Sequence, residues 1–196
     1  MMKASIPLRA RSQRGATLIE VLVSLVILMI GLLGLVGLMV QSQRAQLESY
    51  QRVQALLLMQ DMAVRLSSNK AVASCYVLPT FLGAGNSTVP AATACAVAAA
   101  STEQKERVTQ DLTEWRDLLL GSAELSKTND KVGAVLGARG CITKDPASDL
   151  YQVSVAWQGS AALVAPPAGV TCGQDQYGSE AARRAVSVTV QLANLS

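Results

Sequence analysis

The chain has 196 residues, of which 17 are basic and 14 acidic, with four cysteines and no histidine. The absence of histidine excludes the Ser-His-Asp and Cys-His mechanisms of nucleophilic catalysis. No two cysteines form a Cys-x-x-Cys pair, which together with the missing histidine argues against a zinc site. The composition therefore predicts a chain that is not an enzyme and has no catalytic residue, no metal and no cofactor.

The N-terminus consists of a basic leader followed by an uncharged apolar run. The leader has no acidic residue and four basic ones, Lys3, Arg9, Arg11 and Arg14. Residues 21–40 carry no formal charge and would form a helix about 30 Å long, which matches the hydrocarbon core of a bilayer. Basic residues before such a span keep the leader in the cytoplasm and send the rest of the chain outward. One carboxylate, Glu20, directly precedes the run. A carboxylate beside a membrane span is costly, so Glu20 is expected to have a partner or a function.

The residues around this junction resemble the prepilin signal of type IV pilins and type II secretion pseudopilins. The resemblance is carried by Gly15, Thr17, Leu18, Ile19 and Glu20. It implies that the prepilin peptidase cuts between Gly15 and Ala16 and that Ala16 becomes the methylated N-terminus, where the family usually has phenylalanine. This candidate cleavage site precedes the apolar run, unlike the site of a secretory signal, so the mature chain keeps its apolar helix.

The same resemblance gives Glu20 a role in assembly. A carboxylate in a low dielectric gains from a nearby cation and loses without one, and the new amine of Ala16 is such a cation. The resemblance implies that Glu20 of an incoming subunit pairs with the terminal amine of a neighbour and sets the register of a filament. The alternative is a plain signal anchor in which Glu20 lies in the headgroup region without a function.

Removal of the leader changes the charge balance. All four leader charges are basic, so the mature chain keeps 13 basic and 14 acidic residues and has a net charge of −1. The formal charge of +3 is therefore a property of the precursor. We expect no nucleic-acid partner for the mature form.

The apolar run is expected to continue as one long helix over residues 17–66. No proline or glycine interrupts residues 41–66, and their apolar residues recur at helical spacing in two adjoining stripes. The stripes are Leu47, Tyr50, Val53, Leu57 and Val64, and Leu56, Met59, Ala63 and Leu66. A flexible linker would instead show a cluster of Gly, Ser or Pro after Val40. Within the apolar run, Gly31, Gly34 and Gly37 permit either close helix packing or a soft spot in the helix.

A second helix is predicted after Ser101, a good N-cap with Gln104 three residues on. The apolar face of this helix would bury Val108, Leu112, Trp115 and Leu119. We interpret Trp115 as a core residue, and Gly121 as the end of the helix. We assign Asp111 and Glu114 to the solvated face.

The remaining elements predict an antiparallel sheet. Two segments alternate with period two and one buried face each, from Tyr151 to Trp157 and from Val186 to Leu192, and a weaker strand is expected over residues 139–143. The fold class is therefore α+β, a long N-terminal helix packed against an antiparallel sheet, as in pilins. The expected divisions are a leader (1–15), a membrane or filament-core helix (16–40), the amphipathic half of that helix (41–67) and an exported αβ domain (68–196).

All four cysteines follow the apolar run, in the part expected to be exported, so disulfides are their natural interpretation. Four cysteines allow three pairings, and sequence order favours Cys75–Cys95 and Cys141–Cys172. The implied compartment is oxidising, such as a bacterial periplasm. A long connection over residues 159–180 is equally compatible with a binding surface and with a tethered loop that only packs.

Motifs in the exported part resemble one branch of the family, the minor pilins called type IV pilus modification proteins (PilV). These motifs are Asp111-Leu112-x-x-Trp115, Gly140-Cys141-Ile142, Tyr151-x-Val153-x-Val155-x-Trp157-x-Gly159 and Cys172-Gly173. The resemblance implies a single-pass inner-membrane precursor with a periplasmic C-terminal domain that later enters the pilus (fimbrium). It also implies a role in pilus assembly, adhesion and twitching motility. The implied partners are the prepilin peptidase, other minor pilins and the major pilin, with a tip adhesin as a further candidate. The alternatives are a minor pseudopilin of type II secretion and a signal-anchored periplasmic enzyme or receptor.

Overall fold

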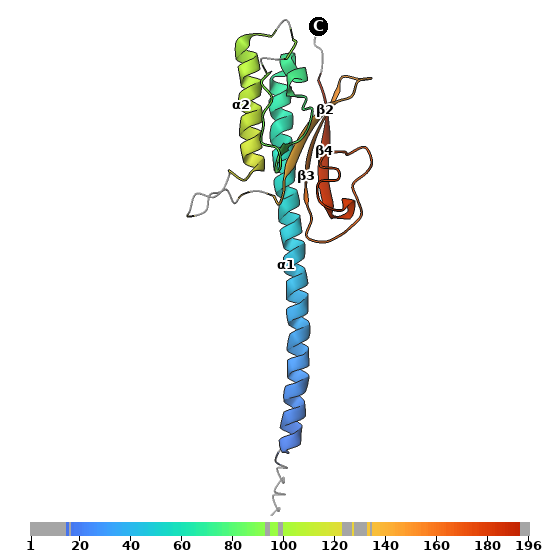
Figure 1. Ribbon diagram of the computed structural model, residues 1–196. Coiled ribbons are helices and arrows are strands. Elements are labelled where there is room, and N and C mark those ends of the chain that lie inside the picture. The colour runs from blue at the N-terminus through green and yellow to red at the C-terminus, as the bar shows by residue number, and fades with distance from the viewer. Residues whose placement is uncertain are drawn as a thin grey trace, which may run out of the picture. The chain divides into compact units, whose positions relative to one another are not determined.

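The structure is a computed structural model that describes residues 15, 17–92, 95–97, 100–122, 127, 133 and 135–192. The chain divides into two compact units, Met1–Arg44 and Ala45–Ser196. The helix α1 (Leu18–Ser68) begins in the first unit and ends in the second. In the second unit, α1 and α2 lie side by side against an antiparallel sheet (Figure 1). This arrangement confirms the predicted α+β, pilin-like fold class.

In the first unit, α1 is a regular helix whose side chains are all exposed. The Thr17 carbonyl accepts the first backbone hydrogen bonds, from the N–H groups of Glu20 (3.0 Å) and Val21 (3.3 Å). The helix continues unbroken through Gly31, Gly34 and Gly37, around which a Cβ atom would meet nothing within 4 Å. Among the residues that the structure describes, the apolar half of α1 therefore has no packing partner.

In the second unit, α1 buries one stripe of the amphipathic half. The buried residues are Ala55, Met59, Met62 and Leu66, which lie three or four positions apart and therefore share one face. The other apolar stripe faces solvent, since Leu47, Tyr50, Val53, Leu57 and Val64 are all more than half exposed. The domain therefore packs against the face of α1 that carries Met59 and Leu66, and the stripe from Leu47 to Val64 stays exposed.

The segment between the two helices contains a short 3₁₀ helix and a short strand. A 3₁₀ helix, η1 (Lys70–Tyr76), directly follows α1, and the two-residue strand β1 (Leu82–Gly83) pairs with the next strand of the sheet. Gly83 has a φ of +115°, and a Cβ there would overlap the Ala138 carbonyl. The disulfide Cys75–Cys95 ties η1 to the later part of the segment.

The second helix, α2 (Thr102–Leu119), confirms the predicted boundaries and face. The Ser101 side chain accepts a hydrogen bond from the Gln104 N–H, and the Gln104 side chain accepts one from the Ser101 N–H, which completes a capping box. Gly121 follows the helix with a φ of +90°, the left-handed conformation that commonly ends helices. The predicted apolar residues Val108, Leu112, Trp115 and Leu119 are all buried, and Asp111 is buried beside them. The Trp115 indole donates a hydrogen bond to the Leu58 carbonyl of α1 (2.9 Å), which fixes the two helices together.

The sheet has four antiparallel strands in the order β1-β2-β3-β4. The later strands are β2 (Arg139–Lys144), β3 (Leu150–Gln158) and β4 (Arg183–Gln191), and a short 3₁₀ helix, η3 (Glu180–Ala182), leads into β4. The two strands that the alternation predicts and the weaker strand expected over residues 139–143 are therefore all present. Val153 and Val155 of β3 join the hydrophobic core with the buried residues of both helices.

The prediction of one buried face for β3 is wrong. Ser154 (3% exposed) and Ala156 (0%) are buried as well, although they lie on the side that faces away from the helices. The long connection covers this side: the Cys172 sulfur lies 3.8 Å from the Ser154 carbonyl oxygen, and a Cβ on Gly173 would lie 3.0 Å from that of Ala156. Part of the connection therefore forms a second cover on the sheet.

Gly140 of β2 permits α2 to approach the sheet closely. A Cβ at this position would overlap the Trp115 ring and lie 2.8 Å from Leu119 Cδ1. We expect Gly140→Ala to lower the free energy of unfolding by about 1–3 kcal/mol through overpacking. The matched control is Gly169→Ala, because a Cβ on Gly169 meets nothing within 4 Å. Urea unfolding of both variants checks this, and equal midpoints would contradict it.

Candidate functional site

The junction between leader and helix is only partly described. Gly15 and Thr17 are exposed, and α1 begins at Leu18, directly after the junction. Ala16 and the basic leader lie outside the described residues. The cleavage at Gly15–Ala16 and the methylation of Ala16 therefore stay predictions, made for a segment whose described neighbours are accessible.

Glu20 is the third residue of α1. A carboxylate in the first helical turn is favoured by the partial positive charge of the helix N-terminus. The Ser24 hydroxyl donates to the Glu20 backbone carbonyl (2.6 Å) and leaves the carboxylate free. Among the residues that the structure describes, no ion pair or hydrogen bond engages the Glu20 carboxylate. Glu20 is thus an exposed acid at the start of an apolar helix, available to a cation from outside this chain.

The apolar part of α1 has the length and composition of a membrane span. Its most apolar 18-residue window has a mean hydropathy of 2.9, and none of that window is buried within the protein. An isolated helix this apolar would not remain in water, because its exposed apolar side chains favour transfer to lipid or protein. The apolar part of α1 is therefore suited to a bilayer or to a bundle of neighbouring helices.

Comparison with protein families gives one match. Residues 10–36 match the prokaryotic N-terminal methylation motif. This is the type of N-terminal motif that the resemblance to type IV pilins and pseudopilins predicts, and cleavage by the prepilin peptidase stays a prediction. The leader, the junction and the first part of α1 all fall within the match, so it supports the resemblance on which the interpretation of Gly15, Ala16 and Glu20 rests. Together with the apolar helix, the motif fits a precursor anchored in the inner membrane.

The match covers the N-terminal segment and does not extend into the second unit. The search of curated proteins and that of solved structures find no match. What the second unit contributes has to be inferred from its own contacts.

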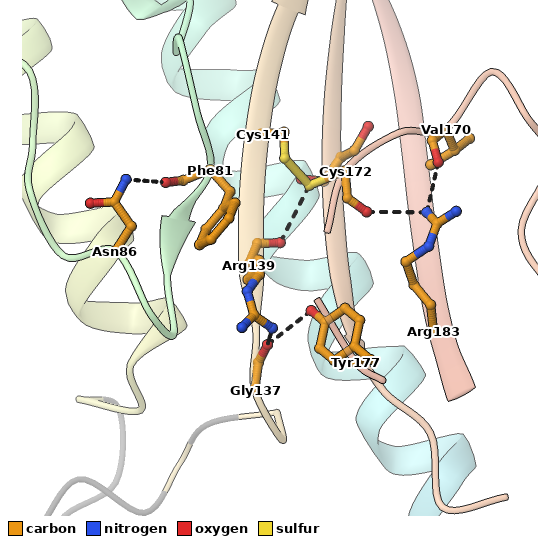
Figure 2. The surroundings of a disulfide bond; sticks show 10 residues. Phe81, Asn86, Gly137, Arg139, Cys141, Val170, Cys172, Tyr177 and Arg183 are labelled. Carbon is orange, nitrogen blue, oxygen red and sulfur yellow. Dashed lines mark hydrogen bonds between the residues drawn. A yellow bond between two sulfur atoms is a disulfide. The ribbon is translucent and has the colours of Figure 1, made fainter. Parts of the chain in front are cut away.

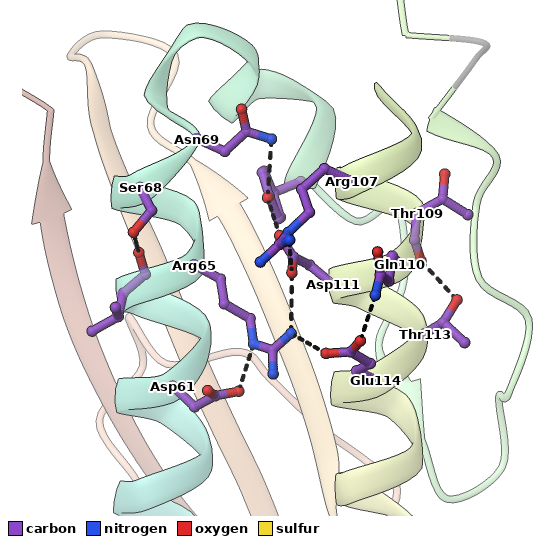
Figure 3. Close-up of polar contacts among 12 residues, drawn as sticks. Asp61, Arg65, Ser68, Asn69, Arg107, Thr109, Gln110, Asp111, Thr113 and Glu114 are labelled. Carbon is purple, nitrogen blue, oxygen red and sulfur yellow. Dashed lines mark hydrogen bonds and ion pairs between the residues drawn. The ribbon is translucent and has the colours of Figure 1, made fainter. Parts of the chain in front are cut away.

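The end of α1 is joined to α2 by a charged cluster, which we call the α1–α2 clasp (Figure 3). Its members are Asp61, Arg65, Tyr76, Arg107, Asp111 and Glu114. Arg65 of α1 bridges to two acids of α2, Asp111 at 3.0 Å and Glu114 at 2.5 Å. The Arg65 guanidinium lowers the pKa of Glu114, which is otherwise solvated.

Asp111 is the centre of the clasp, and its assignment to a solvated face is wrong. Its side chain is only 2% exposed. Beyond Arg65, the carboxylate accepts a hydrogen bond from the Tyr76 hydroxyl (2.6 Å) and pairs with Arg107 (3.3 Å). A signal for this burial exists in the sequence, because position 111 lies within the apolar stripe of α2, next to Leu112. Glu114, by contrast, is 45% exposed.

The clasp makes stability sensitive to alkaline pH through Tyr76. Burial, reinforced by the hydrogen bond to Asp111, raises the pKa of Tyr76 above its ordinary value of 10.0. Above that pH the unfolded chain releases the Tyr76 proton while the folded chain retains it, so the free energy of unfolding falls as the pH rises. We expect Tyr76→Phe to make this fall shallower, although burial also raises the pKa of Tyr177. Urea unfolding between pH 8 and pH 11 checks this, and an equally steep fall in the variant would contradict it.

A second cluster of contacts in the domain surrounds the disulfide Cys141–Cys172 (Figure 2). This disulfide joins β2 to the long connection, and Cys75–Cys95 is the other; these are the two pairings that sequence order favours. Arg183, only 3% exposed, donates to the carbonyls of Val170 (2.7 Å) and Cys172 (3.1 Å). Its ion pair with Glu180 neutralises the buried charge and lowers the pKa of Glu180.

Arg139 contacts the part of the same connection that contains Tyr177. Its guanidinium carbon lies 5.0 Å from the centre of the Phe81 ring and 4.6 Å from that of Tyr177, within the range of a cation–π contact. The Tyr177 hydroxyl donates to the Gly137 carbonyl (2.9 Å). The sequence does not single out Arg139 or Arg183, because nothing local distinguishes them from surface arginines.

Proposed function

We propose that this chain is a minor type IV pilin of the PilV kind. It would be inserted in the inner membrane, cut after Gly15 and assembled with other minor pilins and the major pilin. The minor-pilin complex would start or cap the fibre and support adhesion and twitching motility. The observation that carries this proposal is the methylation motif over residues 10–36 joined to an exposed apolar helix.

The contacts of the second unit support a presenting role over a catalytic one. The Arg65–Asp111 ion pair holds α2 against α1, and Arg183 and the disulfide Cys141–Cys172 hold the long connection against the sheet. Among the described residues, no three His, Cys, Asp or Glu side chains gather in a group that could hold a metal. A rigid domain on a helix that packs with its neighbours is what a filament subunit requires.

The role of Glu20 is the first test of this proposal. A strain that lacks the native chain and carries Glu20→Ala or Glu20→Gln should form no more surface pili than the deletion strain itself. The reason is that the terminal amine of a neighbouring subunit would be left without an acid to pair with. The matched control is Glu106→Ala, which removes an exposed glutamate from α2 and should restore piliation fully. Immunoblots of membranes establish that each variant is present at the normal level.

Two outcomes would contradict the proposal. Full piliation and twitching with neutralised Glu20 would favour a plain signal anchor. Normal pili in the deletion strain, with loss of exoprotein secretion, would assign the chain to type II secretion instead.

A further inference from the structure

The long connection presents an apolar surface to solvent. Residues 161–168 read Ala-Ala-Leu-Val-Ala-Pro-Pro-Ala and contain no polar side chain. Leu163 is 57% exposed and Val164 is 91% exposed. Consecutive exposed apolar residues are unusual on a soluble surface and indicate a contact with something else. We call residues 161–168 the apolar tip.

The apolar tip is held in place by hydrogen bonds from the domain. The Leu163 N–H donates to the Ala181 carbonyl (2.8 Å), and Arg184 Nη2 donates to the Ala161 carbonyl (2.7 Å). Arg184 Nε in turn pairs with Glu48 Oε1 of α1 at 2.7 Å. The exposed side chains therefore belong to a fixed loop, and a fixed loop loses less conformational entropy on contact.

A groove of about 690 Å³ lies between the apolar tip and α1. Its lining is mostly apolar and includes Ala45, Trp157, Leu163 and Val164. Because Arg184 neutralises Glu48, the charge that remains at the groove is that of Arg52. Arg52 is exposed, and no partner engages it among the described residues. An apolar surface beside a free cation suits the headgroup layer of a membrane with anionic lipids.

The sequence places this groove close to the membrane span. Ala45 follows Val40, the last residue of the apolar run, by five residues. Five residues reach at most about 17 Å even when fully extended, so Ala45 is tethered near the end of the span whatever the course of the chain between them. The headgroup layer on each side of a bilayer adds roughly 5–7 Å to the hydrocarbon core.

We propose that the apolar tip and Arg52 dock on the lipid surface of the membrane that holds α1. Leu163 and Val164 would enter the interfacial layer, and Arg52 would pair with lipid phosphates. This inference rests on the proposed function, because it applies to the membrane-inserted stage before assembly. Docking would hold the domain against the bilayer until the subunit enters a filament.

The test uses the full chain in vesicles of phosphatidylethanolamine and phosphatidylglycerol. Val164→Trp puts a fluorescent reporter on the apolar tip. Ala147→Trp is the matched control, on the exposed turn between β2 and β3, at the opposite end of β3. Brominated lipids should quench most of the added Val164→Trp fluorescence and none of that of Ala147→Trp, after subtraction of the unchanged chain. Adding Arg52→Gln to Val164→Trp should weaken the quenching, and replacing phosphatidylglycerol by phosphatidylcholine should do the same.

Each other outcome overturns the inference in a distinguishable way. Vesicle flotation reports the anchor separately: a chain that floats without quenching of Val164→Trp retains the anchor and refutes the docking. A chain that does not float refutes the membrane-anchored precursor, and the docking with it. Equal quenching of both reporters would mean that the domain lies on lipid without using the apolar tip. An unquenched blue shift that grows with protein density would assign the tip to a neighbouring copy of the chain.

Discussion

Asp111→Ala is expected to lower the free energy of unfolding by about 3–5 kcal/mol, the cost of removing one partner from a buried ion pair. The substitution leaves the Arg65 guanidinium and the fully buried Tyr76 hydroxyl without their common acceptor. Urea unfolding of the detergent-solubilised chain, followed by tryptophan fluorescence, measures the change. Trp115 lies on the same helix as Asp111, so its emission follows the separation of α2 from α1.

Two variants calibrate this expectation. Asp149→Ala removes an aspartate that is 70% exposed and pairs with Lys144 at 2.9 Å, and it should cost no more than about 1 kcal/mol. Asp111→Asn keeps an acceptor for Tyr76 but loses the charge, so its cost should fall between the two. If Asp111→Ala unfolded at the same urea concentration as Asp149→Ala, the clasp would not be holding the helices together.

Loss of the disulfide Cys141–Cys172 is the second large effect. The bond closes a sequence separation of 31 residues, for which loop entropy alone predicts a cost of roughly 3–4 kcal/mol. The double variant Cys141→Ala/Cys172→Ala should also expose the side of β3 that carries Ser154 and Ala156, since the connection would lose its tether. Hydrogen exchange of β3 amides, measured beside urea unfolding, checks both consequences.

Reduction supplies the control for this variant. The other disulfide, Cys75–Cys95, closes a separation of 20 residues, and the corresponding double alanine variant should leave exchange in β3 nearly unchanged. Dithiothreitol reduces both disulfides, so it should lower the free energy of unfolding of the unchanged chain by more than either double alanine substitution does. A Cys141→Ala/Cys172→Ala chain with protected β3 amides would show that the connection covers the sheet without its disulfide.

Elements with a local signal are the ones that the sequence predicts well. The capping box of α2 needs only Ser101 and Gln104, three residues apart, and β3 and β4 alternate over their own length. The apolar run and its junction are local too, which is why the methylation motif is visible without any structure. β1 escapes prediction because two residues are too few to show a period.

The contacts that organise the domain are distant in sequence and could not be predicted in this way. Arg65 and Asp111 are 46 residues apart, and Glu48 and Arg184 are 136 apart. The local sequence does not distinguish these charged residues from solvent-exposed ones, because their partners are brought close only by the fold. The second cover on β3 has the same origin, since Ser154 and Ala156 read as solvent-facing until the connection folds over them.

The mature N-terminus tests the central claim most directly. Mass spectrometry of the chain from cells with and without the prepilin peptidase should show a peptidase-dependent start at Ala16, carrying a methyl group on its amine. That result would place the chain in the filament pathway with its apolar helix intact. An unprocessed start at Met1 or Met2, or a cut after Val40, would contradict the claim and leave an ordinary anchored or secreted protein.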